Sequence, residues 1–299
     1  MKAVWSLWTK PFLSNRKAIW FTEMHHLLSW VLSLETARKH FGKTALCTDD
    51  AGARLLVDEL GLEFDTVTTE LNALDNHDAK WWALGKIYTY RLQNEPFIHI
   101  DSDAFLWKPL PVSPDTALFA QNPDSFVTGA SCYKPEGFEA VVVRVPGGWL
   151  PKEWLWYRAS GIAQRAEACG VFGGGHIEFI RYYANLAIQL IEHSGNQTAW
   201  HHLSDRVERN ILAEQYLLSA CIEYHQNHSD SPFRNINIEY LFNSMAEAYE
   251  PQKAAKVGFT HLVASAKKNR DIAEKLENRV KKDYPDAYER CMLKMQKLG

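Results

Sequence analysis

Short apolar runs alternate with helical stripes of apolar residues along the first hundred positions of the chain. The runs are typical of buried strands, which we expect at residues 3–8, 44–47, 64–67 and 97–100. The helical stripes lie between them, at residues 24–41, 51–60 and 80–92. Strands that alternate with helices predict an α/β fold with a mixed, mainly parallel sheet that is flanked by helices.

Later in the chain the pattern is less regular. Further strands are expected at residues 105–107, 127–133, 141–145, 169–175 and 257–262, and helices at 176–192 and 207–224. The segment 146–164 is rich in Gly, Pro and Trp and is interpreted as a loop. The absence of repeats or a clear linker favours one continuous domain over residues 1–269. A charged helical tail, interrupted at Pro285, is expected at residues 270–299 and packs on the same domain.

Composition and charge narrow the classes of function. Hydrophobic residues at 46% and charged residues at 23% are ordinary for a soluble globular protein, and a net charge of -3 argues against nucleic acid as a partner. The sequence shows neither a signal-peptide pattern nor an apolar stretch of roughly 18–20 residues that would predict a transmembrane segment. The 5 cysteines are scattered and form no Cys-x-x-Cys pair, which favours reduced thiols and a cytoplasmic location.

Two carboxylates follow the apolar run at residues 97–100. Asp101 and Asp103 are spaced i and i+2, so on a strand both would face the same side. Two neighbouring anions repel each other unless a cation or a proton compensates them, and open α/β sheets bind ligands at the carboxyl ends of strands. We therefore expect a Mn²⁺ or Mg²⁺ site that receives a diphosphate, with a structural turn as the alternative.

His261 is the candidate for a third metal ligand. It directly follows Val257-Gly258-Phe259-Thr260 in the strand expected at residues 257–262, and imidazole is well tolerated by Mn²⁺. Lys267 lies six residues further on, where its ammonium would meet a phosphate oxygen. The alternative interpretation is a solvated loop histidine followed by the basic start of a helix.

These motifs resemble those of the GT-A-fold glycosyltransferases, in particular the type that includes glycogenin and the bacterial lipopolysaccharide galactosyltransferases. That family has a strand ending in Asp-x-Asp, then a short strand and a proline, which Phe97–Pro109 matches. Its late His-x-x-Gly-x-x-Lys motif binds the metal through the histidine and the diphosphate through the lysine. His261 and Lys267 keep this spacing, while Ala264 replaces the glycine and the following Pro-Trp is missing.

The resemblance extends in element order from Ala3 to Lys268 and implies further site residues. The family has an Asp-Gln pair near the reacting sugar, where this chain has Glu214 and Gln215, and we expect these two to be the catalytic pair. An Asn-containing turn lines the sugar site in the family. The matching segment here carries Gly173 and Gly174 in place of the asparagine.

Residues that bind the nucleotide are also implied by the resemblance. Lys86 lies where relatives place a basic residue near the nucleotide phosphates, although a plain surface lysine is an equal alternative. Asp49 ends a strand at a position that contacts the nucleoside in relatives, and the base or ribose would lie near Trp8.

The resemblance implies a Mn²⁺-dependent hexosyltransferase of bacterial glycan biosynthesis that moves a sugar from a nucleotide-diphosphate donor to a saccharide or glycolipid acceptor, with retention of configuration favoured. A catalytically silent GT-A-like domain that binds a glycan or a partner is the alternative. A phosphatase of the haloacid dehalogenase type is a further one, but it would need Thr or Val where Phe105 stands. Peripheral membrane contact through the basic tail stays open.

Overall fold

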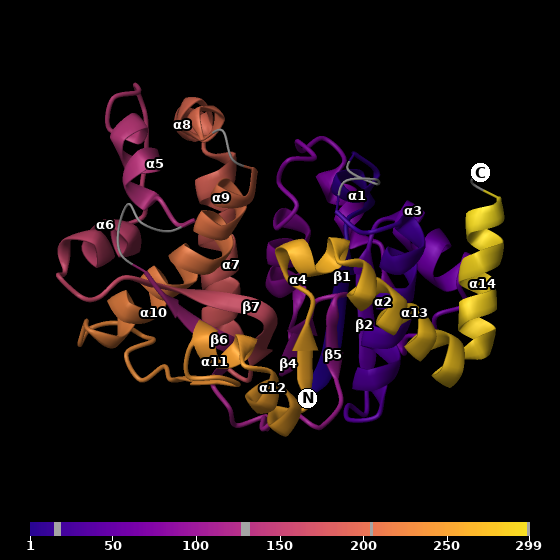
Figure 1. Ribbon diagram of the computed structural model, residues 1–299. Coiled ribbons are helices and arrows are strands. Elements are labelled where there is room, and N and C mark those ends of the chain that lie inside the picture. The colour runs from indigo at the N-terminus through magenta and orange to yellow at the C-terminus, as the bar shows by residue number, and fades with distance from the viewer. Residues whose placement is uncertain (15–18, 127–131, 204–205, 298–299) are drawn as a thin grey trace. The chain divides into compact units, whose positions relative to one another are not determined.

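The computed structural model describes residues 1–14, 19–126, 132–203 and 206–297 (Figure 1). The chain divides into two compact units that alternate along the sequence. Unit 1 comprises Met1–Ala79, Phe97–Pro111 and Pro251–Gly299, and unit 2 comprises Lys80–Pro96 and Val112–Glu250. Both units combine strands with helices, so the α/β class and the mixed, mainly parallel pairing predicted from the sequence are confirmed.

Parallel strands form the sheet of unit 1, in the order β3-β2-β1-β4. Their bounds are Lys2–Leu7 for β1, Thr44–Thr48 for β2, Thr66–Thr68 for β3 and Phe97–Ile100 for β4. Val4 of β1 pairs with Ala45 on one side and with His99 on the other. Because the strands run in the same direction, their carboxyl ends meet at one edge of the sheet, where α/β proteins place ligands.

Helices and short turns complete unit 1. They are α1 (Thr9–Ser14), α2 (Glu23–Arg38), α3 (Asp50–Ala53), η1 (Arg54–Glu59), η2 (Glu70–Leu74), α12 (Pro251–Val257), η5 (Ala264–Lys268), α13 (Arg270–Asp283) and α14 (Pro285–Gln296). Helix α2 is buried almost all round, as expected for a helix that is apolar on most faces. The C-terminal helices α13 and α14 pack against it, and Pro285 begins α14, so the tail is helical and interrupted as predicted.

A separate two-stranded ribbon belongs to unit 1. Strand β5 (Ala104–Leu106) pairs antiparallel with β9 (Phe259–His261), and Ala104 lies opposite His261. The backbone N–H of Leu106 donates to the Thr36 hydroxyl at 3.1 Å, which fixes β5 against α2. The ribbon brings the late part of the chain next to the residues that follow β4.

Unit 2 contains the strand order β7-β6-β8, with β6 antiparallel to β7 and parallel to β8. The strands are β6 (Leu118–Ser125), β7 (Arg165–Gly174) and β8 (Ile238–Tyr240). The helices and helical turns are α4 (Leu84–Leu92), α5 (Pro135–Val142), α6 (Lys152–Ala159), α7 (Ile177–Glu192), η3 (Ser194–Asn196), α8 (Gln197–His202), α9 (Arg206–Ile211), η4 (Leu212–Tyr216), α10 (Leu217–Gln226) and α11 (Met245–Tyr249).

Some expected elements of unit 2 are wrong. The strand expected at residues 141–145 begins inside α5, because Pro135 starts a helix and Phe138 and Val142 bury one helical face. The loop expected at 146–164 contains α6, and β6 was not predicted. The strand expected at 127–133 falls largely on residues 127–131, which lie outside the described residues.

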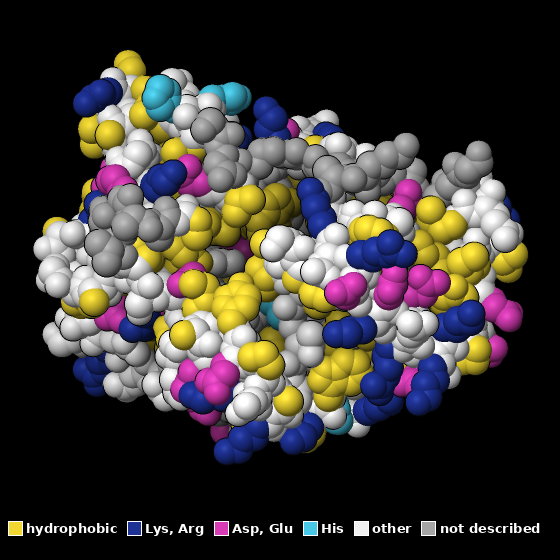
Figure 2. Space-filling view, viewed as in Figure 1, with side chains coloured by type: hydrophobic (Ala, Val, Ile, Leu, Met, Phe, Trp, Pro, Cys, Tyr) yellow, Lys and Arg dark blue, Asp and Glu magenta, His cyan; other side chains and the backbone are white. Residues whose placement is uncertain are grey.

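The surface carries charges of both signs. On the face shown in Figure 2, Lys and Arg side chains are interspersed with Asp and Glu side chains, with apolar side chains between them. Within the described parts of the chain, every helix falls short of the length and apolar character that crossing a membrane requires.

His26, inside α2, predicts how the stability of the protein depends on pH. Burial lowers the pKa of its imidazole to about 3, so the unfolded chain binds a proton more readily. The free energy of unfolding should therefore fall as the pH drops from about 6.5 towards 3, by about 1.4 kcal/mol per pH unit from this group. We expect His26→Gln to reduce that slope by about one proton in urea unfolding at a series of pH values. A slope equal to that of the wild type would contradict the assignment.

Candidate functional site

Asp101 and Asp103 lie in the turn that joins β4 to β5. Strand β4 ends at Ile100, and the backbone N–H of Ala104 donates to the carbonyl of Asp101 at 3.0 Å. The two carboxylates therefore converge through this turn and not through the alternation of a strand, although the predicted outcome is the same. The backbone N–H of Leu262 donates to the carbonyl of Asp103 at 2.9 Å, which ties the turn to the end of β9.

The imidazole of His261 completes a cluster with these carboxylates. Its Nε2 lies 3.3 Å from Oδ1 of Asp103 and 3.8 Å from Oδ2 of Asp101. One ligand atom from each of the three residues lies within 4.8 Å of the others. Two carboxylates and an imidazole form a donor set that fits Mn²⁺, so the structure brings together the residues predicted to hold a metal ion.

Lys267 also reaches this cluster, where its ammonium pairs with Oδ2 of Asp103. Burial alone would raise the pKa of the Asp103 carboxyl group. The ammonium of Lys267 and the imidazole of His261 reverse this effect and hold that pKa well below its usual range. Asp103 is therefore ionised across the physiological pH range, which is the form that binds a cation.

Buried side chains contact Asp101 through its backbone carbonyl and its carboxylate. The Ser33 hydroxyl donates to the backbone carbonyl of Asp101 at 3.0 Å and accepts from the Trp5 indole N–H at 2.9 Å. Nδ1 of His99 lies 3.7 Å from Oδ1 of Asp101, and its Nε2 lies 2.9 Å from the Ser6 hydroxyl. The sequence interpretation missed this support, although the position of His99 two residues before Asp101 was a signal for it.

Ala264 adopts a left-handed backbone conformation with φ of 49°. Glycine adopts this conformation without a steric penalty, whereas the side chain of an alanine strains it. The left-handed region costs a non-glycine residue about 1–2 kcal/mol, and a glycine loses part of that gain through its flexible unfolded state.

We expect Ala264→Gly to raise the free energy of unfolding by about 0.5–1 kcal/mol, because it relieves this backbone strain. Urea unfolding of the purified variant measures the change. A loss of stability would show that the alanine side chain makes packing contacts worth more than the strain.

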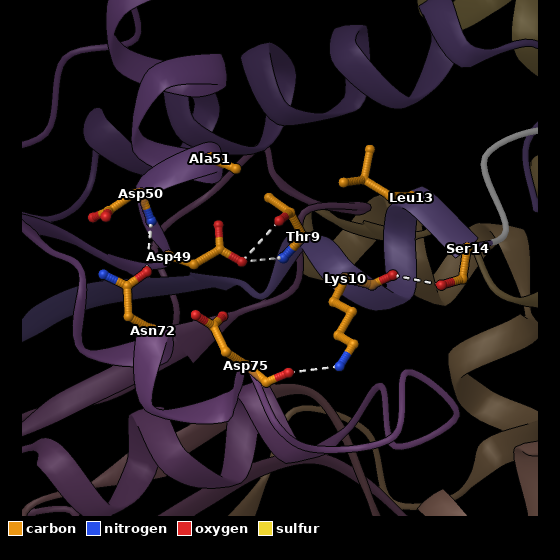
Figure 3. A pocket seen from close by; sticks show the side chains of 9 residues that line it. All are labelled: Thr9, Lys10, Leu13, Ser14, Asp49, Asp50, Ala51, Asn72 and Asp75. Atoms are coloured by element: carbon orange, nitrogen blue, oxygen red, sulfur yellow. Dashed lines mark hydrogen bonds between the residues drawn. The ribbon is translucent and has the colours of Figure 1, made fainter.

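A pocket of about 570 Å³ opens at the carboxyl ends of β1 and β2 (Figure 3). It is lined by Thr9, Lys10, Leu13, Ser14, Asp49, Asp50, Ala51, Asn72 and Asp75. Lys10 donates to the backbone carbonyls of Asp75 and His77 at 2.6 and 2.8 Å. Within the described part of the chain, the carboxylates of Asp50 and Asp75 make no hydrogen bond, so the pocket offers acceptors to a ligand.

Asp49 is engaged by the protein itself. One oxygen accepts from the Thr9 backbone N–H at 2.7 Å and from its hydroxyl at 2.8 Å. The other accepts from the Gly52 N–H at 2.8 Å and so caps α3. Trp8 is buried and is not among the lining residues. The predicted nucleoside contacts of Asp49 and Trp8 stay predictions. The lining residues Asp50, Asn72 and Asp75 were missed, although Asp50 lies only two residues beyond the end of β2.

The hydrogen bonds of Asp49 predict that replacing it destabilises the protein far more than replacing its neighbour Asp50. Asp49→Ala should lower the free energy of unfolding by about 2–4 kcal/mol, because it leaves buried N–H and O–H donors without an acceptor. Asp50→Ala is the matched control and should change it by less than about 0.5 kcal/mol. Urea unfolding of both variants checks the pair, and equal effects would contradict the role of Asp49.

Lys86 and Glu214 meet inside unit 2. The Lys86 ammonium lies 2.7 Å from Oε1 of Glu214 and donates to the Cys169 carbonyl at 3.1 Å. Oε1 of Glu214 also accepts from the Tyr90 hydroxyl at 3.3 Å, and the Glu214 side chain is 0% exposed. The structure therefore joins the residue predicted to contact phosphate to the residue predicted to be catalytic, in one buried ion pair.

Gln215 and the predicted glycines also lie in unit 2. Gln215 is half-buried on the π-helical turn η4, a form often found at functional sites, and its Oε1 accepts from the Tyr133 hydroxyl at 2.6 Å. Gly173 pairs with Phe119 in the sheet. Gly174 has φ of 144°, and a Cβ there would lie 2.1 Å from the Ala117 carbonyl oxygen, so this glycine permits close packing of the backbones.

The protein is thus an α/β protein whose unit 1 carries a candidate metal centre. Two aspartates and a histidine form this centre beyond the carboxyl end of a parallel strand. The chain belongs to the family of unknown function DUF6734, whose model matches residues 1–294. No curated protein matches the chain.

Proposed function

We propose that the protein is a metal-dependent glycosyltransferase that moves a sugar from a nucleotide-diphosphate donor to a hydroxyl of a saccharide or glycolipid acceptor. The observation that carries this proposal is the convergence of Asp101, Asp103, His261 and Lys267. Bound Mn²⁺ would supply positive charge where the departing diphosphate becomes negative. The two carboxylates and the imidazole hold the ion, and Lys267 offers a donor to a phosphate oxygen.

The pocket at the ends of β1 and β2 supports a nucleoside as the other half of the donor. It lies along the same edge of the unit 1 sheet as the metal centre, because β1, β2 and β4 run parallel. The carboxylates of Asp50 and Asp75 suit ribose hydroxyls or base N–H groups as donors. They disfavour a phosphate, which would be repelled by them, so the diphosphate is expected beside Lys267.

Glu214 favours a second candidate, a catalytically silent domain that binds a donor or a glycan. Its carboxylate is fully buried and paired with Lys86, so in this conformation it is shielded from a sugar. Under the first proposal Glu214 and Gln215 act on the sugar or acceptor, with retention of configuration, and under the second they only hold unit 2 together.

A thermal-shift screen of UDP-, GDP-, ADP- and dTDP-sugars, each with Mn²⁺ or with EDTA, tests the proposal. A ligand at about 100 times its Kd stabilises the native state by about 2.7 kcal/mol. We expect one donor to raise the melting temperature by roughly 5 °C, only when Mn²⁺ is present. Hydrolysis of that donor, or transfer of its sugar to added saccharides with release of the nucleoside diphosphate, then separates the enzyme from the silent domain.

The outcomes are distinct. A shift with Mn²⁺ followed by turnover supports the glycosyltransferase, whereas a shift without turnover of any kind supports the silent domain. Shifts that persist in EDTA would contradict a metal-bridged donor site. A protein that binds Mn²⁺ but none of these donors would contradict the nucleotide-sugar assignment.

A further inference from the structure

Lys267 already has a partner on one of the predicted metal ligands. Its ammonium pairs with Oδ2 of Asp103, while Oδ1 of the same carboxylate lies 3.3 Å from Nε2 of His261. The two oxygens of Asp103 are therefore approached by side chains from the end of β9 and from the segment that follows it. A divalent ion that binds Asp103 must share this carboxylate with a positive charge.

Further contacts hold Lys267 in this place. Its ammonium lies 5.6 Å from the centre of the Trp20 ring, within the range of a cation–π interaction. The Phe21 backbone N–H donates to the Lys267 carbonyl at 2.9 Å. The side chains of Asp103 and Lys267 are 8% and 22% exposed, so water screens their attraction only in part. The arrangement is a built ion pair and not a loose surface contact.

We propose that Lys267 acts as the resident cation of Asp103 and leaves it when a diphosphate offers a new partner, so that the divalent ion and the diphosphate bind cooperatively. This inference rests on the metal centre of the proposed function. An ion on Asp103 and the ammonium of Lys267 repel each other across the shared carboxylate. A diphosphate accepts hydrogen bonds from the ammonium and neutralises both cations, which removes the repulsion.

The coupling is reciprocal by thermodynamic linkage. If Lys267 opposes the ion in the absence of diphosphate, then removing its charge must strengthen binding of the ion alone. The same change must weaken binding of the ion together with a diphosphate, because the diphosphate loses a charged donor. Opposite signs in the two measurements distinguish this device from general damage to the site, which would weaken both.

The experiment compares wild type, Lys267→Met and Lys268→Met by isothermal titration calorimetry. Lys268 is an exposed neighbour, and its replacement removes the same charge without touching Asp103, so it is the matched control. Each protein is titrated with Mn²⁺ alone and, separately, with Mn²⁺ premixed with equimolar pyrophosphate. We expect Lys267→Met to bind Mn²⁺ about tenfold more tightly than wild type and premixed manganese pyrophosphate about tenfold more weakly.

Each outcome bears on the inference. Equal Mn²⁺ affinities for Lys267→Met and Lys268→Met would overturn the coupling and leave the metal centre standing. Weaker binding of both probes to Lys267→Met would also overturn it. A complete lack of Mn²⁺ binding in all three proteins would overturn the metal centre and the proposed function, and the coupling with them. Melting curves of the apoproteins confirm that the comparison is made on folded protein.

Discussion

Asp103→Asn is expected to lower the affinity for Mn²⁺ by at least about a hundredfold and to abolish any Mn²⁺-dependent donor binding. Changing a residue that only hydrogen-bonds to a metal ligand typically lowers metal affinity or activity by about 10–100-fold. Asp103 is placed as a direct ligand, so its loss should have a larger effect. The amide keeps the shape of the carboxylate but loses the charge that holds the ion. Asparagine is therefore a sharper test than alanine, because it leaves the turn between β4 and β5 filled.

Isothermal titration calorimetry with Mn²⁺ measures the affinity, and a melting curve in EDTA confirms that each variant is folded. Asp58→Asn makes the same chemical change at an exposed position of unit 1 and should bind Mn²⁺ as wild type does. His261→Ala should also lower the affinity for Mn²⁺, because it removes the imidazole ligand. Unchanged Mn²⁺ and donor affinity in both Asp103→Asn and His261→Ala would falsify the metal centre.

The pair of aspartates could be found from the sequence because its geometry is local. The apolar run up to Ile100 predicted a buried strand, and the next residues had to leave it at the carboxyl edge. The two carboxylates were expected to face the same side of a strand. In the structure, a turn closed by the hydrogen bond from the Ala104 N–H to the Asp101 carbonyl brings them together. Neighbouring carboxylates in so short a segment have few ways to lie far apart.

His261 required more than local reasoning. It joins the aspartates because β9 pairs with β5, and no pattern at either strand specifies that antiparallel partnership. The place of His261 at an expected strand end made it a candidate ligand, and the spacing between His261 and Lys267 added the resemblance to a known family as support. The sequence predicted that Lys267 meets a phosphate oxygen. Its pairing with Asp103 is a tertiary contact, which residue spacing alone cannot predict.

The strands and the longer helices of unit 1 were predicted from periodicity, whereas α1, α12 and parts of unit 2 were not. Val141 and Val142 have high strand propensity, but Phe138 and Val142 are buried on one face of α5. Packing of a helical face outweighs the propensity of single residues, which is small. Gly174 was interpreted as part of a sugar-lining turn, which stays a prediction, and the close approach of the Ala117 carbonyl gives it a packing role that the sequence did not predict.

Lys86→Met is expected to lower the free energy of unfolding by about 3–5 kcal/mol, since it leaves a charged carboxylate buried without its partner. Glu214 is fully enclosed, and Lys86 is only 11% exposed, so water replaces little of the lost interaction. The hydrogen bond that the carboxylate accepts from Tyr90 is 3.3 Å long and comes from a neutral donor, so it compensates only part of the charge. Urea unfolding at pH 7 measures the change.

Lys134→Met provides the control, because it removes an exposed lysine of the same unit and should change stability by less than about 0.5 kcal/mol. The double variant Lys86→Met with Glu214→Met removes both charges and keeps similar volumes. It should be more stable than Lys86→Met alone, since no uncompensated charge remains buried. A double variant as unstable as the sum of the two single variants would show that the residues do not interact.

The same variants decide which role the ion pair has. If Lys86 contacts donor phosphates, Lys86→Met must weaken donor binding at a temperature where the variant is still folded. If the pair only neutralises charge inside unit 2, the double variant should bind donor as wild type does and regain most of the lost stability. A double variant that is stable, binds donor and yet fails to turn it over would assign Glu214 a chemical role despite its burial. That result would require this part of unit 2 to open during the reaction, because a carboxylate that is fully buried cannot meet a sugar.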